Sequence, residues 1–316
     1  MKDKPTVSII CLTYNHASYI RECLDGFLMQ QTDFPYEVII HDDASTDGTT
    51  EIIKEYATKY PDIIKPIIQT ENQYSKHRDF GIIINNCIKH STAQYIAFCE
   101  GDDYWINDQK LQKQVKFLDE NQDYGMCYTQ VKNFIQKDKK FDKIWGGDYE
   151  DFSSLLRENT IPTLSVLCRA KSYFSYFETR LQNAGKLMME DYPMWLYFAS
   201  HSKIKFLNEV TGIYRQLPTS ASHTQDILSS ISFGENYRFI AYCYANLYGN
   251  CNDITIAKNN LAWIRFIKHS FLKEYKITKE IAKSYLFSKQ NSIIKNIFFL
   301  IGCIFPKSIS CLYTKR

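Results

Sequence analysis

The sequence predicts an α/β fold in which a mostly parallel, doubly wound sheet is flanked by helices. Four apolar runs lack the alternation of a half-exposed strand, as is typical of parallel strands covered on both faces. They span residues 6–12, 37–40, 63–69 and 95–99. Apolar residues at helical spacing lie between these runs, over 20–28, 52–57 and 80–89. Strands that alternate with helices of this length indicate a parallel sheet.

The composition is that of a folded protein. The chain has 316 residues, of which 45% are hydrophobic and 23% charged, and both values are ordinary for globular proteins. This length allows one large domain with appendages or two small domains. The ten cysteines form no CxxC pair, so we expect buried, reduced thiols in a cytoplasmic protein. The N-terminus leads directly into the first strand, and we expect no signal peptide.

The second half of the chain carries less regular patterns. We expect a helix over 111–118, a long strand over 124–134, a charged excursion over 136–143, a short strand over 165–168 and a helix within 186–199. From residue 227 onward the apolar spacing is helical, with helices expected over 229–248, 255–272 and 279–287. We interpret this last part as a helical C-terminal extension.

Polar residues follow three of the predicted strands at the point where each strand stops. They are Thr13–His16, Asp42–Asp43 and Glu100–Asp103. Ligands bind beyond the carboxyl ends of the strands in an open α/β sheet, so these residues are candidates for a binding site. No GxGxxG follows the first strand and no GxxxxGK[ST] occurs, which argues against a nicotinamide or flavin cofactor and against a P-loop.

The crowded carboxylates at 100–103 allow two interpretations. Close acidic groups repel one another, and a divalent cation bound through one or two carboxylates and substrate phosphates would offset that repulsion. The alternative is a solvated acidic turn that precedes the next helix.

Three motifs together resemble those of the family 2 inverting glycosyltransferases with the GT-A fold. They are Thr13-Tyr14-Asn15, Asp42-Asp43-Ala44-Ser45-Thr46-Asp47-Gly48-Thr49 and Glu100-Gly101-Asp102-Asp103-Tyr104-Trp105. The resemblance runs from about Val7 to His223, and the order and spacing of the motifs are highly specific in combination. It implies a nucleotide-sugar donor, Mn²⁺ or Mg²⁺ as cofactor, and bacterial surface polysaccharide or lipid-linked oligosaccharide assembly.

The resemblance also implies roles at the donor site. Asp43 would bind the base, with Asp42 beside it. Asp102 would be the main metal ligand, at the last carboxylate of the family's DxD element. Glu100 stands where that element usually has Asp. The other residues that would lie against the nucleotide-sugar are Thr13, Tyr14, Asn15 and Gly101.

Glu190 and Asp191 form a second acidic pair. Just before Pro193 they suit a helix N-terminus, where the macrodipole favours carboxylates and proline fits the first turn. The resemblance implies more, because the family carries a Glu-Asp pair at this distance after the DxD element. Asp191 would be the general base that takes the proton of the acceptor hydroxyl, and Glu190 would position the loop or the acceptor.

The segment from Gly212 to His223 resembles the family's mobile segment after the catalytic helix. There Arg215 would approach the diphosphate of the donor, and His223 would be a further metal ligand. Cationic groups at this place would stabilise the charge of a departing nucleoside diphosphate. The alternative is a solvated loop.

The C-terminal region is basic and ends in a strongly apolar run. Residues 253–316 contain twelve Lys and Arg against three Asp and Glu, a net +9, which leaves about −6 for the rest of the chain. Such a tail favours a negatively charged neighbour. The run 293–305 is shorter than the roughly 20 residues that span a bilayer. It is either an in-plane membrane anchor or a helix packed on the body.

We therefore expect a GT-A domain over 1–225, with a nucleotide-binding half (1–105) and an acceptor half (106–225), followed by a helical, basic extension over 226–316. It would transfer a hexosyl or N-acetylhexosaminyl group, with UDP as the preferred nucleotide, to a hydroxyl of a glycan or lipid-linked acceptor. We expect a cytoplasmic protein that contacts the inner face of the cell membrane if the tail is an anchor.

Two other functions compete with this one. A catalytically silent relative would bind a nucleotide-sugar or polysaccharide without turnover. A sugar nucleotidylyltransferase would need a Gly-rich, basic loop after the first strand, which Thr13–His16 is not. A nucleic-acid partner is not expected, because the basic residues of the tail lie among apolar helix faces without a binding motif.

Overall fold

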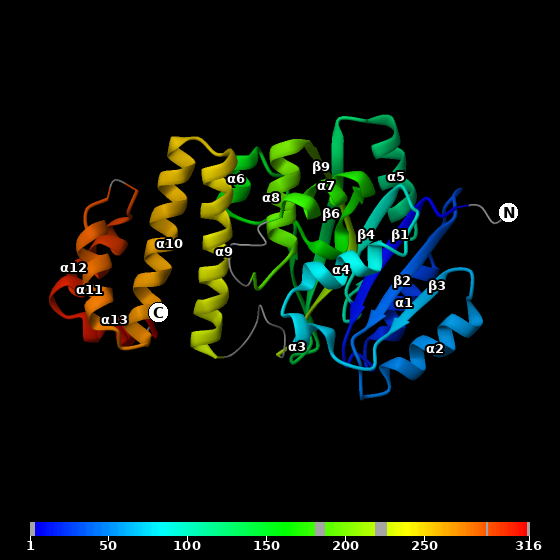
Figure 1. Ribbon diagram of the computed structural model, residues 1–316, viewed down its shortest axis with the longest axis horizontal. Coiled ribbons are helices and arrows are strands. Elements are labelled where there is room, and N and C mark those ends of the chain that lie inside the picture. The colour runs from blue at the N-terminus through cyan, green and yellow to red at the C-terminus, as the bar shows by residue number, and fades with distance from the viewer. Residues whose placement is uncertain (1–3, 181–186, 219–225, 289, 315–316) are drawn as a thin grey trace. The chain divides into compact units, whose positions relative to one another are not determined.

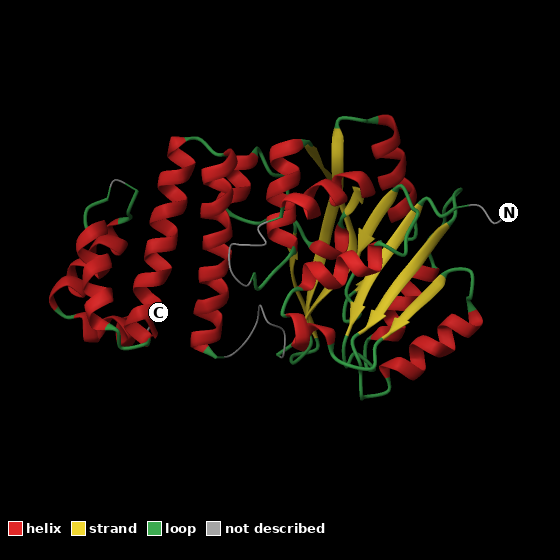
Figure 2. Cartoon of the chain, in the orientation of Figure 1, coloured by secondary structure: helices red, strands yellow, loops and turns green. Residues whose placement is uncertain are grey.

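The computed structural model describes residues 4–180, 187–218, 226–288 and 290–314 (Figure 1). The chain divides into two compact units. The sheet unit comprises the chain up to residue 150 together with residues 159–217, and consists of a sheet with its helices (Figure 2). The helical unit comprises residues 151–158 and the chain from 218 onward, and its described elements are helices (Figure 2).

The predicted parallel strands form one side of the sheet. In the order β3-β2-β1-β4 each neighbouring pair is parallel. All but one of the β1 residues are buried, which explains why this strand is a continuous apolar run without alternation. The elements of this part are β1 (Val7–Thr13), α1 (Ile20–Leu28), β2 (Tyr36–Asp42), α2 (Thr49–Lys59), β3 (Ile64–Ile68), α3 (Gln73–His77), α4 (Phe80–Ile88) and β4 (Tyr95–Phe98).

Beyond β4 the sheet continues with mixed pairing. β8 (Leu167–Arg169) is antiparallel to both β4 and β6 (Tyr124–Ile135), whereas β9 (Lys203–Gln216) is parallel to β6. β5 (Tyr104–Trp105) is antiparallel to β9. The charged excursion expected over 136–143 is in part a strand, because β7 (Lys140–Trp145) forms a hairpin with β6. Its side chains are exposed up to Ile144, so it lacks the apolar alternation by which a strand is recognised.

Trp105 anchors the chain just after the acidic motif. Its ring is buried and packs edge-to-face on Phe27, with the ring centroids 5.0 Å apart. Its indole Nε1 donates to the Leu164 carbonyl oxygen at 2.7 Å, and the Lys110 Nζ lies 4.1 Å from the ring centroid. The remaining helices of the sheet unit are α5 (Lys110–Glu120), the 3₁₀ turn η1 (Thr163–Ser165), α7 (Ala170–Thr179) and α8 (Asp191–His201).

The helical C-terminal extension is confirmed. Its elements are α9 (Ile227–Tyr248), α10 (Cys251–Phe271), α11 (Tyr275–Tyr285), α12 (Ile293–Ile304), the turn η3 (Pro306–Ser308) and α13 (Ile309–Thr314). The helical unit also contains α6 (Phe152–Arg157), from the middle of the chain. The apolar run of α12 is packed on this unit through Phe299, whose ring lies 4.9 Å from that of Phe266 and 5.6 Å from that of Trp263. Among the described residues, no helix has the length and apolarity needed to span a bilayer.

Candidate active site

The loops after β1, β2 and β4 meet at the carboxyl edge of the parallel strands (Figure 1). Backbone hydrogen bonds continue the pairing past the strand ends. The Asp43 amide donates to the Thr13 carbonyl oxygen at 3.0 Å, and the Gly101 amide donates to the Leu12 carbonyl oxygen at 2.9 Å. The three motifs are therefore side by side, at the edge where open α/β sheets bind their ligands.

Gly101 allows the acidic turn to lie against Thr13. A Cβ atom at residue 101 would fall 2.6 Å from the Thr13 Oγ1 and 2.8 Å from its Cβ, and contacts this short cannot be tolerated without movement. Thr13 is buried, and its Oγ1 has no hydrogen-bond partner among the described residues. A buried hydroxyl without a partner is costly, which is consistent with a polar ligand at this position.

Asn15 ties the first loop to the second. It adopts a left-handed backbone conformation with φ 55°, which Asn tolerates better than most residues. Its amide donates to the Ser45 Oγ at 2.9 Å, and its side-chain Oδ1 accepts from the Thr46 amide at 2.9 Å. Tyr14, between Thr13 and Asn15, is 48% exposed. The loop thus presents an exposed ring on a backbone held by side-chain hydrogen bonds.

The two carboxylates at the end of β2 point to different partners. Asp42 is fully buried and accepts from the Ser45 hydroxyl and amide and from the Thr50 hydroxyl, so it holds its own loop. Asp43 accepts from the Gln73 amide at 2.5 Å and from the Tyr74 amide at 3.0 Å. It therefore fixes the start of α3 beside the site. Each carboxylate oxygen has lone pairs for more than one hydrogen bond, so these two contacts do not exhaust the acceptor capacity of Asp43.

Arg215 holds the acidic turn in place. It lies in β9 rather than in a loop, and its backbone amide donates to the Asp103 Oδ1 at 2.7 Å. Its guanidinium donates through Nε to the Asp102 carbonyl oxygen and through Nη2 to the Glu22 Oε2, both at 2.7 Å. Asp103 is buried, whereas Asp102 is only half-buried at the edge of the turn.

Burial and neighbouring carboxylates raise the pKa values of Glu100 and Asp103. Burial, with the charges of Asp102 and Asp191, raises the pKa of Glu100 to about 7. Burial also raises the pKa of Asp103, with contributions from Asp102 and Glu100. Since Asp191 acts on Glu100, the start of α8 is within electrostatic range of the turn. His16 is close to Asp102, although burial lowers the pKa of its imidazole.

A metal ion would fit this turn only together with a donor. No group of three or more His, Cys, Asp or Glu side chains in the described ranges is placed to hold a metal ion. Mg²⁺ is commonly bound by one or two carboxylates plus substrate phosphates, and Glu100 and Asp102 can supply such a pair. A cation would favour the charged form of Glu100, which the turn otherwise disfavours. His223, the predicted second ligand, lies outside the described residues.

Asp191 is the first residue of α8. Its Oδ2 accepts from the Thr163 hydroxyl at 2.8 Å, and its Oδ1 accepts from the Tyr192 amide at 2.8 Å. Burial raises the pKa of the Asp191 carboxyl, while the hydrogen bond from Thr163 lowers it. A half-buried carboxylate with a raised pKa, held by two donors, has the properties of a general base.

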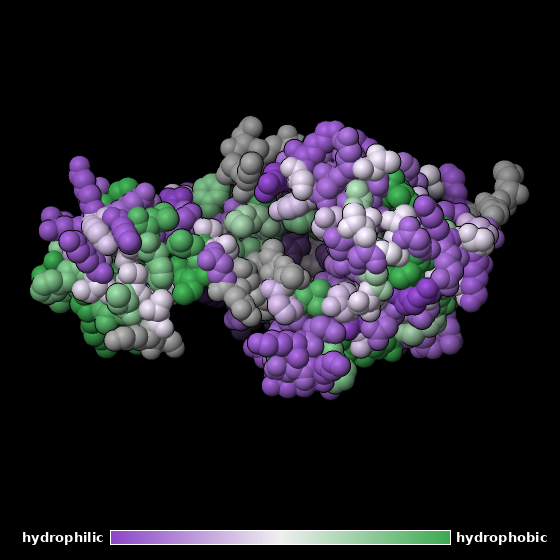
Figure 3. Space-filling view, turned by 90° about the horizontal axis from the view of Figure 1, so that it is seen from below, coloured by the Kyte–Doolittle hydropathy of each residue, from purple (hydrophilic) through white to green (hydrophobic). Residues whose placement is uncertain are grey.

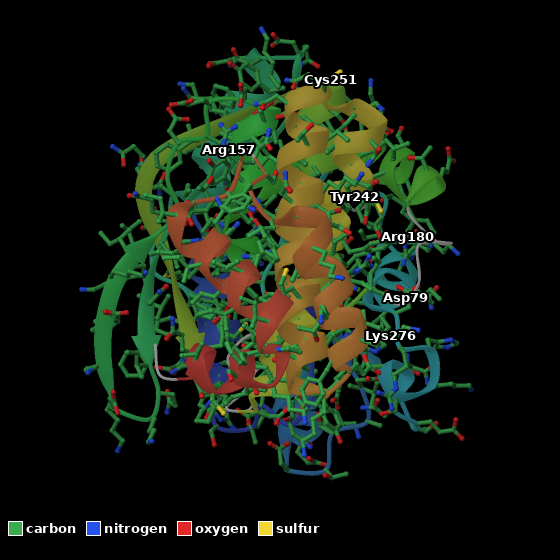
Figure 4. All side chains as sticks on the ribbon, turned by 90° about the vertical axis from the view of Figure 1, so that its left-hand side faces the viewer. Asp79, Arg157, Arg180, Tyr242, Cys251 and Lys276 are labelled. Carbon is green, nitrogen blue, oxygen red and sulfur yellow. The ribbon has the colours of Figure 1, made fainter. Side chains whose placement is uncertain are left out.

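Glu190 belongs to a buried network behind Asp191. The Tyr176 hydroxyl donates to its Oε1 at 2.6 Å, and the Arg180 Nε lies 3.3 Å from the same oxygen. Arg180 in turn donates through Nη2 to the Asp79 Oδ1 at 2.6 Å (Figure 4). Burial raises the pKa of Glu190 to about 7, although Arg180 opposes this. This network links α4, α7 and the start of α8, so Glu190 positions the residue that follows it.

Comparison with known proteins identifies the family. The model of the glycosyl transferase family 2 matches residues 8–202. The chain belongs to glycosyltransferase family 2. The matched range contains the three loops at the strand ends and the Glu190–Asp191 pair.

The chain is similar to bacterial proteins over different lengths. It is 37% identical over 214 residues to the uncharacterized protein Rv1520 of Mycobacterium tuberculosis. The matched region covers 66% of this chain and 58% of that protein. It is 27% identical over 256 residues to WfaP of Escherichia coli, named UDP-Glc:alpha-D-GlcNAc-diphosphoundecaprenol beta-1,3-glucosyltransferase. This match covers 77% of this chain and 93% of WfaP. The chain thus spans just over half the length of its mycobacterial relative.

Solved structures resemble this one in fold. S. aureus TarS 1–349, in complex with UDP-GlcNAc, has a TM-score of 0.64 at 16% identity, covering 98% of this chain and 92% of that one. The mannosyltransferase PcManGT from Pyrobaculum calidifontis, in complex with GDP-Man and Mn²⁺, has a TM-score of 0.54 at 17% identity, covering 98% and 85%. The predicted GT-A fold is confirmed.

Several residues around this site were not predicted as site residues. Thr163 and Arg180 carry no local signal in the sequence, and no separate role was predicted for His16 or Asp103 within their motifs. The strand that holds Arg215 could have been found, because Ile204 and Phe206 alternate with lysines at its start. The contacts of Thr163 and Arg180 join segments far apart in the chain, which spacing does not encode.

Gly101→Ala is expected to destabilise the protein, because the new Cβ would collide with Thr13. Over-packing of this kind costs about 1–3 kcal/mol, so the midpoint of urea unfolding should fall with an unchanged m-value. Gly147→Ala is the matched control, since a Cβ there meets nothing within 4 Å. Equal unfolding midpoints for the two variants would show that the turn does not depend on this close approach.

Proposed function

We propose that the sheet unit is an inverting glycosyltransferase that transfers a sugar from a UDP-sugar to a hydroxyl of a glycan or lipid-linked acceptor. The observation that carries this proposal is the proximity of two acidic groups with different surroundings. The acidic turn around Asp102 suits a metal-bound diphosphate, and Asp191 suits a general base. The short turn η1 joins them, because the Trp105 indole, just after the acidic turn, donates to the Leu164 carbonyl oxygen, and the neighbouring Thr163 hydroxyl donates to Asp191.

The donor would lie along the carboxyl edge of β1, β2 and β4. Asp43 would accept from the N–H of a uracil, with Thr13 and Asn15 against the nucleotide and Tyr14 beside it. Thr13 would offer its partnerless hydroxyl to the donor. UDP is favoured by the carboxylate at the base position and by the UDP-GlcNAc complex of TarS, whereas the GDP-Man complex of PcManGT is the reason to test other nucleotides.

Asp191 would activate the acceptor. In a single displacement the acceptor oxygen attacks the anomeric carbon, and the bond from that carbon to the diphosphate oxygen breaks with its electron pair. The proton of the acceptor hydroxyl passes to a carboxylate oxygen of Asp191. Attack from the face opposite the departing diphosphate inverts the configuration at the anomeric carbon.

The leaving diphosphate would be stabilised at the acidic turn. A divalent cation held by Asp102 and Glu100 would supply positive charge to the departing phosphates. Arg215 is already bonded to the Asp102 carbonyl oxygen and to Glu22, so we assign it the positioning of the turn. Glu190 would act in the same way on Asp191.

The resemblance to WfaP supports a proposal for the acceptor and for the location of the protein. WfaP is named for an acceptor that carries a diphosphoundecaprenol group, and such a lipid resides in a membrane. We therefore propose a membrane-borne acceptor, with the protein acting at the cytoplasmic face. The competing function is a silent relative that binds a nucleotide-sugar without turnover.

Asp191→Asn is expected to abolish turnover and retain donor binding. Loss of a general base typically costs about 10²–10⁴ in rate, whereas the amide leaves the donor site intact. UDP release from UDP-GlcNAc and from UDP-Glc would be measured with water as acceptor, and UDP binding by calorimetry. Asp142→Asn on β7, which is exposed, is the control. A silent relative would show no release in the wild type, and full release in Asp191→Asn would remove Asp191 from the reaction.

Thr163→Val is expected to move the acid limb of the pH–rate profile upward. The Thr163 hydroxyl stabilises the charged carboxylate of Asp191, so its removal raises the pKa of this group. The base is active only when deprotonated, so activity then appears at higher pH. Thr163→Ser should keep the wild-type limb. Identical limbs in all three proteins would contradict the assignment of Asp191.

A further inference from the structure

The helix α12 presents one face to its unit and another to the surroundings. Phe298, Phe299 and Gly302 are buried against the helical core. The opposite face carries an apolar stripe, which we define as Ile293, Ile297, Leu300 and Ile304. These side chains are 80%, 51%, 45% and 59% exposed. Figure 3 shows hydrophobic residues gathered on the visible face of the C-terminal helices.

The loop before α12 adds a strained aromatic residue. Phe287 has a φ of 60° and is 74% exposed. A bulky side chain rarely adopts this left-handed conformation because its Cβ is crowded there. The conformation is held by a hydrogen bond of 3.0 Å from the Phe287 amide to the Asn296 Oδ1 on α12. The strained backbone at Phe287 places its ring in the surroundings, where the ring adds nothing to the stability of the core. Strained residues of this kind are a reason to look for a function.

The last part of the chain carries mostly basic residues. After Glu280 the sequence contains no acidic residue, and the basic residues that follow are Lys283, Lys289, Lys295, Lys307, Lys315 and Arg316. Lys295 is half-buried and lies 5.8 Å from the centroid of the Trp263 ring. On α11, which packs against α12, the exposed Glu280 is outnumbered by the exposed Lys276, Lys279 and Lys283. An apolar face beside an excess of lysines complements a bilayer with anionic headgroups.

The dimensions of α12 decide how it could meet a bilayer. Twelve residues rise about 18 Å at 1.5 Å per residue, well short of the roughly 30 Å hydrocarbon core. Its inner face is also committed to the helical core. The helix can therefore lie in the plane of the interface with its outer face inserted, and it cannot cross.

We propose that the apolar stripe and Phe287 insert into the surface of a bilayer that contains anionic lipids. Lys283, Lys295 and Lys307 would lie at the level of the lipid phosphates. This inference deepens the proposed function, on which it rests for the membrane-borne acceptor, because it names the surface and the class of lipid. Two weak signals, apolar and electrostatic, would act together, as stable attachment without a spanning helix requires.

The test is sedimentation of the whole chain with vesicles, without donor or acceptor. We expect binding to vesicles of 30% phosphatidylglycerol in phosphatidylcholine, and binding at least about tenfold weaker to phosphatidylcholine alone. Ile297→Ser should weaken binding to the anionic vesicles roughly tenfold, because one apolar anchor is lost. Ile144→Ser on β7 removes an isoleucine with the same 51% exposure and should leave binding unchanged.

Phe287→Asn separates docking from folding. Asn tolerates the left-handed conformation, so the variant should be at least as stable as the wild type to heat. Its affinity for anionic vesicles should nevertheless fall by about five- to tenfold. A variant that is more stable and binds less cannot be explained by damage to the fold.

Two results would overturn the proposal. One is equal affinity of the wild type, Ile297→Ser and Phe287→Asn for anionic vesicles. The other is self-association that is lost in Ile297→Ser without any vesicle binding, which would assign the stripe to a second copy of the chain. Neither outcome bears on UDP release in solution. Loss of the docking proposal and loss of the proposed transferase activity are thus recorded by separate measurements.

Discussion

The bonds of Arg215 to the acidic turn are the contacts on which the site depends. Three carboxylates over four residues repel one another, and the turn persists because Arg215 binds one of them with its backbone amide and the next residue's carbonyl with its guanidinium. The same guanidinium reaches Glu22 on α1. One residue of β9 therefore joins the strand to the turn and to the helix after β1, and leaves Asp102 at the edge of the sheet.

The two acidic groups of the site are prepared in different ways. At the turn, burial and neighbouring charges raise the pKa of Glu100, and a cation with a diphosphate would reverse that effect. At the start of α8, burial raises the pKa of Asp191 while Thr163 restrains it. Different environments give carboxyl groups different pKa values, so that residues of one type can take different roles in one reaction. The buried network of Glu190 and Arg180 fixes the start of α8 against α4 and α7.

The sequence alone was sufficient to predict the parallel strands and the edge of the sheet at which their loops meet. Apolar runs such as β1 are buried on both faces, and their ends mark one edge of the sheet. It was not sufficient for β7, whose exposed face carries charges. For β9 the alternation at its start was a usable signal, but Arg215 was expected in a mobile segment and lies in this strand. Contacts such as Thr163 to Asp191 depend on packing between distant segments. His223 lies outside the described residues, so its predicted role stays a prediction.

The most direct measurement is the thermal stability of the protein with UDP, GDP, CDP and dTDP, each with and without Mn²⁺, in the wild type and in Asp102→Asn. A ligand at one hundred times its dissociation constant adds about 2.7 kcal/mol to stability, enough to shift the Tm by several degrees. We predict a shift with UDP that requires Mn²⁺ and is lost in Asp102→Asn. No shift with any nucleotide, or a shift that survives both the omission of Mn²⁺ and the substitution, would contradict a metal-assisted donor site at the acidic turn.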